Sequence, residues 1–92
     1  MAKKINRLTD ALNRGNLISA NKSLAENEGR YRLFFFIKRI DKKFQLEIEL
    51  VDMKLPMEFD ALEENSFEFE FFPEVVDFLE REYQMKILDF HR

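Results

Sequence analysis

A chain of 92 residues without cysteine is long enough for one small domain, and it offers no disulfide, thiolate nucleophile or zinc–thiolate site. Its two glycines and two prolines argue against a disordered linker, and its longest apolar run, five residues, is far shorter than the ~20 residues of a membrane span. We therefore expect one cytoplasmic domain over residues 1–92, with no targeting segment and no membrane interaction.

Charge is distributed unevenly along the chain, although the net charge is only −3. Residues 1–55 contain twelve Lys or Arg against seven Asp or Glu, a net charge of +5, whereas residues 56–92 contain three against eleven, a net charge of −8. Such asymmetry is typical of halves that pack together and partly neutralise each other, of head-to-tail self-association, or of two surfaces for different partners.

The first 29 residues are basic, and their apolar residues recur at helical spacing on both sides of Gly15. The two apolar stripes lie ~140° apart, which predicts two short helices, roughly over residues 3–14 and 17–27, rather than one straight helix. A DNA-binding helix-turn-helix is disfavoured, because Asp10 and Asn21 stand where that motif places apolar residues. The basic side chains of this segment are candidates for nucleic-acid contacts, and their commoner role is a solvated face. They are Lys3, Lys4, Arg7, Arg14 and Lys22.

The apolar period changes to two at Tyr31, where "YRLFFFIKRI" and "FQLEIELVDMKL" flank a short polar "DKK" turn. These two runs predict an antiparallel hairpin. In the second run apolar and polar residues alternate, so this strand has one buried face and one wet face. The first run is apolar on both faces between Leu33 and Ile37, which indicates that both faces need a cover.

The parity of the first strand decides which large side chains leave the core. If the odd-numbered residues between Leu33 and Ile37 point inward, Phe34 and Phe36 emerge on the face that carries Glu47 and Glu49. With the opposite parity the odd-numbered residues emerge instead. In either case the C-terminal helix covers the emerging side chains, or they form the dry centre of an interface.

The last third of the chain continues the sheet and then turns helical. "MEFDALEEN" predicts an irregular or briefly helical connection, and "SFEFEFF" alternates as a third strand. Pro73 is suited to the first turn of a helix along "EVVDFLEREY". "QMKILDF" is either a short final strand or an extension of that helix, and as a strand it would complete a parallel crossover from Ser66 to Phe90.

Together these elements predict an α+β fold. It consists of an N-terminal helical pair in the basic segment 1–29, a three-stranded antiparallel meander in 30–72, and a C-terminal helix with an acidic tail in 73–92.

Catalytic and metal-binding chemistry find little support. The single histidine, His91, is second from the last residue, and no hydroxyl residue stands in a nucleophile elbow. The two glycines are isolated, so no phosphate-binding loop is present, and the carboxylates lack the spacing of a calcium loop. We therefore expect no enzyme activity, no cofactor, no metal site and no small-molecule substrate.

The acidic face of the predicted sheet most strongly suggests a function. If the second and third strands are neighbours, glutamates line one surface, and facing like charges cost stability unless a cation offsets them. Arg32 and Lys38 are the internal candidates for that cation, and a basic protein surface is the external one. The predicted partner-binding residues are Phe34, Phe36, Glu47, Glu49, Glu68 and Glu70.

From these features we expect a non-enzymatic protein-binding module, such as the small inhibitors or adaptors that phages and mobile elements direct at host machinery. One alternative is a nucleic-acid-binding dimer that uses the basic N-terminal helices. Another is a structural subunit of an oligomer, for example of a homodimer, in which its Phe-rich face is permanently buried.

Overall fold

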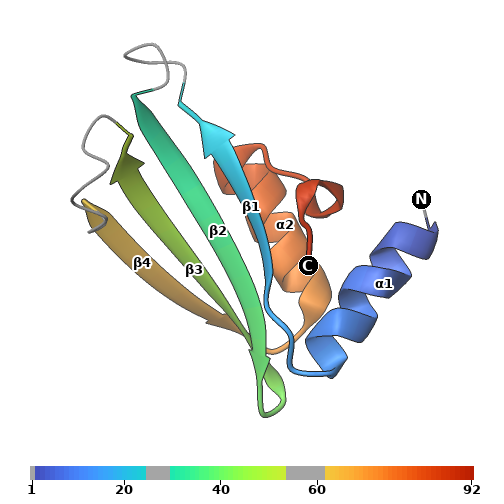
Figure 1. The fold of residues 1–92 in the computed structure, drawn as a ribbon. Helices are drawn as coiled ribbons and strands as arrows, with labels where there is room; N and C mark the ends of the chain where they lie inside the picture. The colour runs from blue at the N-terminus through green and yellow to red at the C-terminus, as the bar shows by residue number, and fades with distance from the viewer. Residues whose placement is uncertain (1, 25–29, 54–61) are drawn as a thin grey trace.

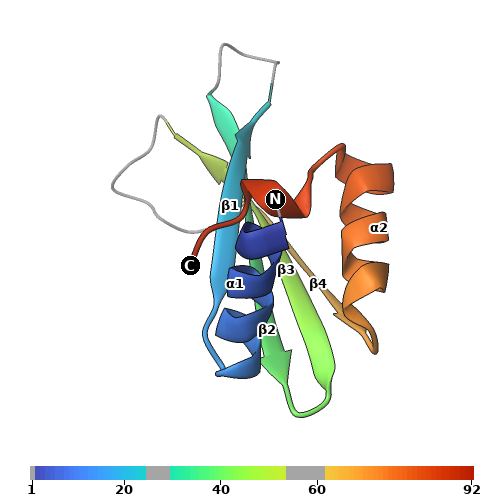
Figure 2. The same ribbon diagram turned by 90° about the vertical axis from the view of Figure 1, so that its right-hand side faces the viewer.

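One four-stranded antiparallel sheet organises the chain, and both helices pack on the same face of it (Figures 1 and 2). The computed structural model describes residues 2–24, 30–53 and 62–92. In chain order the elements are α1 (Ala2–Asn13), β1 (Ile18–Ser23), β2 (Tyr31–Ile40), β3 (Lys43–Asp52), β4 (Glu63–Phe69), α2 (Phe72–Tyr83) and the 3-10 turn η2 (Ile87–Asp89). The strand order is β1-β2-β3-β4. The α+β class and the antiparallel sheet are confirmed, whereas the three-stranded meander with an N-terminal helical pair is wrong.

The first predicted helix is confirmed as α1. Leu8, Ala11 and Leu12 are buried on one side of it, as their helical spacing predicts. The helix ends at Asn13, and Gly15 follows with a φ of 82°, a left-handed conformation that glycine adopts without steric cost. The chain can therefore reverse direction directly into the sheet.

The second predicted helix, over residues 17–27, is wrong, because its described part contains strand β1. Ile18 and Ala20 point into the core opposite Ile37 and Phe35 of β2. The intervening serine and asparagine residues are poor helix formers, since their side chains compete for backbone hydrogen bonds. Cross-strand packing thus overrides a weak helical pattern, and the remaining residues, 25–27, lie outside the described part of the chain.

The predicted hairpin is confirmed as β2 and β3, which pair along their whole length with Phe35 opposite Ile48. Asp41 stands in the turn between them with a φ of 57°. The third predicted strand is confirmed as β4, which begins three residues earlier than its alternating pattern, at Glu63. Most of the predicted connection "MEFDALEEN" lies outside the described residues.

The C-terminal helix is confirmed as α2, with Pro73 in its first turn. Val75 and Leu79 are fully buried against the sheet. The stretch "QMKILDF" forms neither a strand nor an extension of α2. Its first residue, Gln84, has a left-handed conformation and ends the helix, and the short turn η2 follows. His91 then pairs with Ser19 at the opposite edge of the sheet, so the predicted parallel crossover is also wrong.

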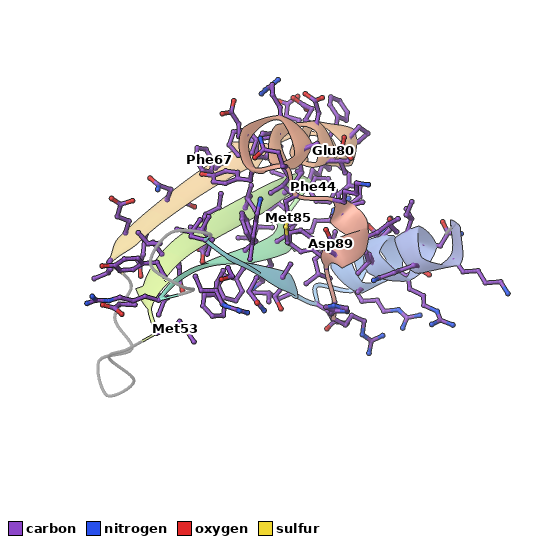
Figure 3. The ribbon with its side chains drawn as sticks, turned by 90° about the horizontal axis from the view of Figure 1, so that it is seen from above. Phe44, Met53, Phe67, Glu80, Met85 and Asp89 are labelled. Atoms are coloured by element: carbon purple, nitrogen blue, oxygen red, sulfur yellow. The ribbon has the colours of Figure 1, made fainter. Side chains whose placement is uncertain are left out.

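The core lies between the helical layer and one face of the sheet. Phe35 is fully buried at its centre, where its ring contacts Tyr83 and Phe90 with centroid distances of 5.4 and 6.3 Å. Seen from above, Phe44 and Phe67 lie on the side of the sheet that carries α2, and many side chains project from the opposite side (Figure 3). The fold therefore has one covered face and one face without a described helix over it, which we call the open face.

Candidate functional site

The centre of the open face is aromatic. Because Phe35 and Ile37 point into the core, the alternate residues Phe34 and Phe36 of β2 must point the other way. Both are half-buried, and they stand opposite Glu49 and Glu47 of β3. The odd-numbered residues of β2 between Leu33 and Ile37 therefore point inward, and the even-numbered phenylalanines emerge on the open face.

A hollow of about 590 Å³ lies beside the two aromatic rings, on the β1 side of the open face. Ser19, Asn21 and His91 contribute to its lining together with Phe34 and Phe36. The aromatic centre thus combines apolar rings with a concave, polar flank, which is the kind of surface into which a partner side chain can insert.

Four carboxylates run along the β3–β4 side of the same face. We call them the acidic row: Glu47, Glu49, Glu64 and Glu68. Glu49 and Glu64 are directly opposite each other across the two strands, and Glu47 is two residues from Glu49 on the same strand face. A depression of about 220 Å³ lies between them, so the row borders a shallow trough.

Glu49 stands in an environment that is unfavourable for an ionised carboxylate. Partial burial raises the pKa of its carboxyl group, and the nearby charges of Glu64 and Glu47 raise that pKa further. A raised pKa means that the folded chain opposes the negative charge at this position. A positive group placed over the row would act in the opposite direction.

The expected internal cations, Arg32 and Lys38, form no ion pair with the row in the described part of the chain. Arg32 donates a hydrogen bond from Nη1 to Asn21 Oδ1 on β1, and Lys38 stands opposite Gln45, where it is exposed. Within residues 2–24, 30–53 and 62–92, none of the ion pairs involves the acidic row. The amide of Gln45 donates a 3.5 Å hydrogen bond to Glu47 Oε1 in the row, and a shorter one of 3.0 Å to Ser66 Oγ on β4.

The structure brings together five of the six predicted partner-binding residues, namely Phe34, Phe36, Glu47, Glu49 and Glu68. Glu70 follows the end of β4 and is exposed, outside the paired part of the sheet. Glu64 was missed, because the alternating pattern that marked the third strand starts at Ser66. Extending that strand by one more pair of residues would have placed Glu64 on the same face as Glu68.

Helix α2 does not cover the aromatic centre, so that expectation is corrected. Its ring contacts are with residues of the covered face: Phe72 with Phe44, and Phe78 with Phe67 and Phe69. Only two residues separate the helix from β4, and the helix packs on the face to which those phenylalanines point, which is the covered face.

The basic residues proposed for nucleic acid do not form one surface. Lys3, Lys4 and Arg7 line a hollow of about 500 Å³ with His91 and Arg92 from the end of the described chain. Arg14, by contrast, follows the opposite end of α1. Lys22 lies on β1, and its Nζ donates a 2.8 Å hydrogen bond to the backbone oxygen of Tyr83 in α2. Nucleic-acid binding by this segment stays a prediction, and Lys22 has a structural contact of its own.

In the part of the chain that the structure describes, no three His, Cys, Asp or Glu side chains are grouped so as to hold a metal ion. No helix there is long and apolar enough to cross a membrane. Comparison with protein-family models, with curated proteins and with solved structures finds no significant match to this chain.

Proposed function

We propose that this chain is a non-catalytic protein-binding module, an inhibitor or adaptor that presents the open face of its sheet to a basic partner protein. One observation carries the proposal: two aromatic side chains and four carboxylates share a sheet face that neither α1 nor α2 covers. The partner that we propose for the open face is a different protein, with Lys or Arg side chains around an apolar contact.

The aromatic centre supports a protein partner rather than a small ligand. Phe34 and Phe36 lie on the same face of one strand, two residues apart, and are only half-buried in the free chain. Large aromatic side chains near the middle of a surface, surrounded by polar groups, are typical of residues that dominate the energy of protein interfaces. A partner that removes them from water gains the corresponding apolar burial.

The acidic row supports a partner of positive charge. Partial burial, and then the charges of Glu64 and Glu47, raise the pKa of Glu49, so the free chain holds this carboxylate ionised at a cost. A Lys or Arg from the partner relieves this repulsion and forms a charge-assisted hydrogen bond, so the free energy gained exceeds that of an isolated surface pair. Complementary charge also accelerates the encounter of the two proteins and selects against acidic competitors.

The test uses the double variant Glu49→Gln/Glu64→Gln. Replacing two facing carboxylates with amides removes a repulsion, so we expect the free energy of unfolding to rise by roughly 0.2–1 kcal/mol. Capture of the partner should fall, because the cation loses its counter-charges. Urea unfolding measures the first effect, and quantitative mass spectrometry of proteins retained by the immobilised chain measures the second. If the variant is more stable but captures less of the partner, the loss of binding cannot be a consequence of unfolding.

The matched control is the double variant Asp10→Asn/Glu80→Gln, which removes the same charge from exposed positions on α1 and α2. It should retain the same basic protein as the unmodified chain. The proposal is overturned if Glu49→Gln/Glu64→Gln retains that protein undiminished, or if the control variant loses it to the same extent.

A further inference from the structure

The two edges of the sheet differ in how they end. At the β1 edge, the backbone N–H of Ser19 donates to the oxygen of His91, and the N–H of His91 donates to the oxygen of Ser19, both at 2.8 Å. At the other edge, β4 pairs with β3 on one side, and no strand among the described residues pairs with its outer side. An unpaired edge presents a row of backbone donors and acceptors to any extended chain.

A second copy of this chain is a poor occupant of the β4 edge. The strand carries Glu63, Glu64 and Glu68, and pairing β4 with another β4 would bring these carboxylates close to their counterparts. Charged residues on edge strands commonly serve to prevent such self-association. The same carboxylates favour a strand that carries positive charge. They therefore select a basic partner and also disfavour a second copy of this chain.

The side chains on the two faces of β4 determine which types of side chain would suit each face of a strand added beside it. On the open face its side chains would lie beside Glu64, Ser66 and Glu68, which favours Lys or Arg. On the covered face they would lie beside half-buried Phe67 and Phe69, which favours apolar residues along the second half of β4, and beside exposed Glu63 and Asn65 along its first half. Because strand side chains alternate between faces, the two requirements combine into one alternating pattern.

Helix α2 extends the apolar surface on the covered side of this edge. Phe78 is half-buried, and its ring centroid lies 4.8 Å from that of Phe67 and 5.4 Å from that of Phe69. These three half-buried rings therefore form an apolar strip along the covered face of β4. Leu62 and Phe71, which flank β4 in sequence, are large apolar residues that are 54% and 64% exposed.

We propose that the outer edge of β4 accepts an extended segment of the partner in which basic and apolar residues alternate. The segment adds a fifth strand, with its basic side chains beside Glu64 and Glu68 of the acidic row and its apolar side chains on the strip of Phe67, Phe69 and Phe78. This inference rests on the proposed function, because it names the mode in which a basic partner binds. Backbone hydrogen bonds supply affinity, and the alternating side chains supply specificity.

The test uses a seven-residue peptide of alternating valine and lysine, since β4 has seven residues. It is titrated into the full ¹⁵N-labelled chain and followed by NMR. We expect chemical-shift changes centred on β4 and slower hydrogen exchange of its backbone amides. A peptide of the same sequence with alternate backbone nitrogens methylated keeps its charge but loses donors that strand pairing needs, so it should bind much more weakly.

Two variants of the chain check the orientation. Glu64→Lys places a repulsive charge beside the lysines of the peptide, and we expect it to weaken binding by roughly three- to tenfold. Glu63→Lys makes the same change of net charge on the other face of the strand, and its effect should be smaller. Equal effects of the two variants would contradict the predicted orientation and overturn the alternating pattern.

The outcomes separate strand addition from the more general proposal. If the methylated peptide binds as well as the unmodified one, with shifts over β2 and β3, strand addition is overturned while docking of a basic partner on the open face stands. Failure of both peptides to bind overturns strand addition, while the capture experiment with Glu49→Gln/Glu64→Gln decides docking on the open face. Binding of the unmodified peptide alone, with protection of β4 amides, supports both.

Discussion

At Glu49, the demands of the fold and those of the proposed partner are opposed. Burial and the charges of Glu64 and Glu47 raise the pKa of this carboxyl group, so the folded chain disfavours its ionised form. A residue selected only for stability would be neutral at this position, as Gln45 is on the same strand face. The carboxylate gains a favourable role only when a cation lies over it.

This opposition predicts a pH-dependent effect of Glu49→Gln. A folded-state pKa above the unfolded value means that the native state binds the proton more tightly, so stability falls as the pH rises through the raised pKa. Glutamine mimics the protonated form. The variant should therefore be more stable than the parent at pH 7, and the gain should vanish below pH 4.5, the ordinary pKa of the group. Urea unfolding at pH 4 and pH 7 measures both values.

Glu80→Gln is the control for that comparison, because it removes one carboxylate from an exposed position on α2, away from the sheet. It should change the free energy of unfolding little at either pH. A Glu49→Gln gain that persists unchanged at pH 4, or an equal gain for Glu80→Gln, would mean that crowding in the acidic row is not its cause.

At the scale of elements, the spacing of apolar residues identified a helix or strand from the sequence when its apolar face is long enough. The α1 stripe of Leu8 and Leu12 and the alternation in β3 and β4 each reflect contact with a single core, so local pattern and final structure agree. Strand β1 has only Ile18 and Ala20 to mark its buried face, which is too short a signal to distinguish a period of two from a helical one. Its identity comes from pairing with β2, which is a tertiary effect.

The candidate site was predictable to the extent that it follows from strand parity. Register placed Phe34 and Phe36 beside Glu47 and Glu49 once the buried side of β2 was known. The position of α2 was not predictable in this way, because either face of β2 is apolar enough to receive a helix. The phenylalanines of β4 settle the choice, since Phe67 and Phe69 contact Phe78 on the covered side.

The assignment of faces predicts the reactivity of single cysteines, which the cysteine-free chain allows without background. A cysteine in place of Phe36 on the open face should react quickly with a maleimide in the native state. A cysteine in place of Ala20, which is 6% exposed, should react at least ~100-fold more slowly, because its exposure requires local opening of the core. Similar rates at the two positions in chains with native circular dichroism would contradict the assignment.

At the scale of the whole molecule, the opposite charges of the two halves are not joined by ion pairs in the described ranges. Arg30 pairs with Asp52 at 2.9 Å, within the basic half, and Arg81 pairs with Asp77 at 3.1 Å, within the acidic half. The halves pack through the apolar core and the β3–β4 ladder instead. Among the described residues, no ion pair engages the acidic row of the open face either.

The most direct test of the open face as a docking surface is site-specific photocrosslinking in cells. A photoreactive phenylalanine analogue is placed at Phe36, and in a second chain at Glu80 on α2. We predict an adduct with a basic protein from Phe36 alone, and its loss when the same chain also carries Glu49→Gln/Glu64→Gln. Equal adducts from both positions, or an adduct from Phe36 only with a second copy of this chain, would contradict the account.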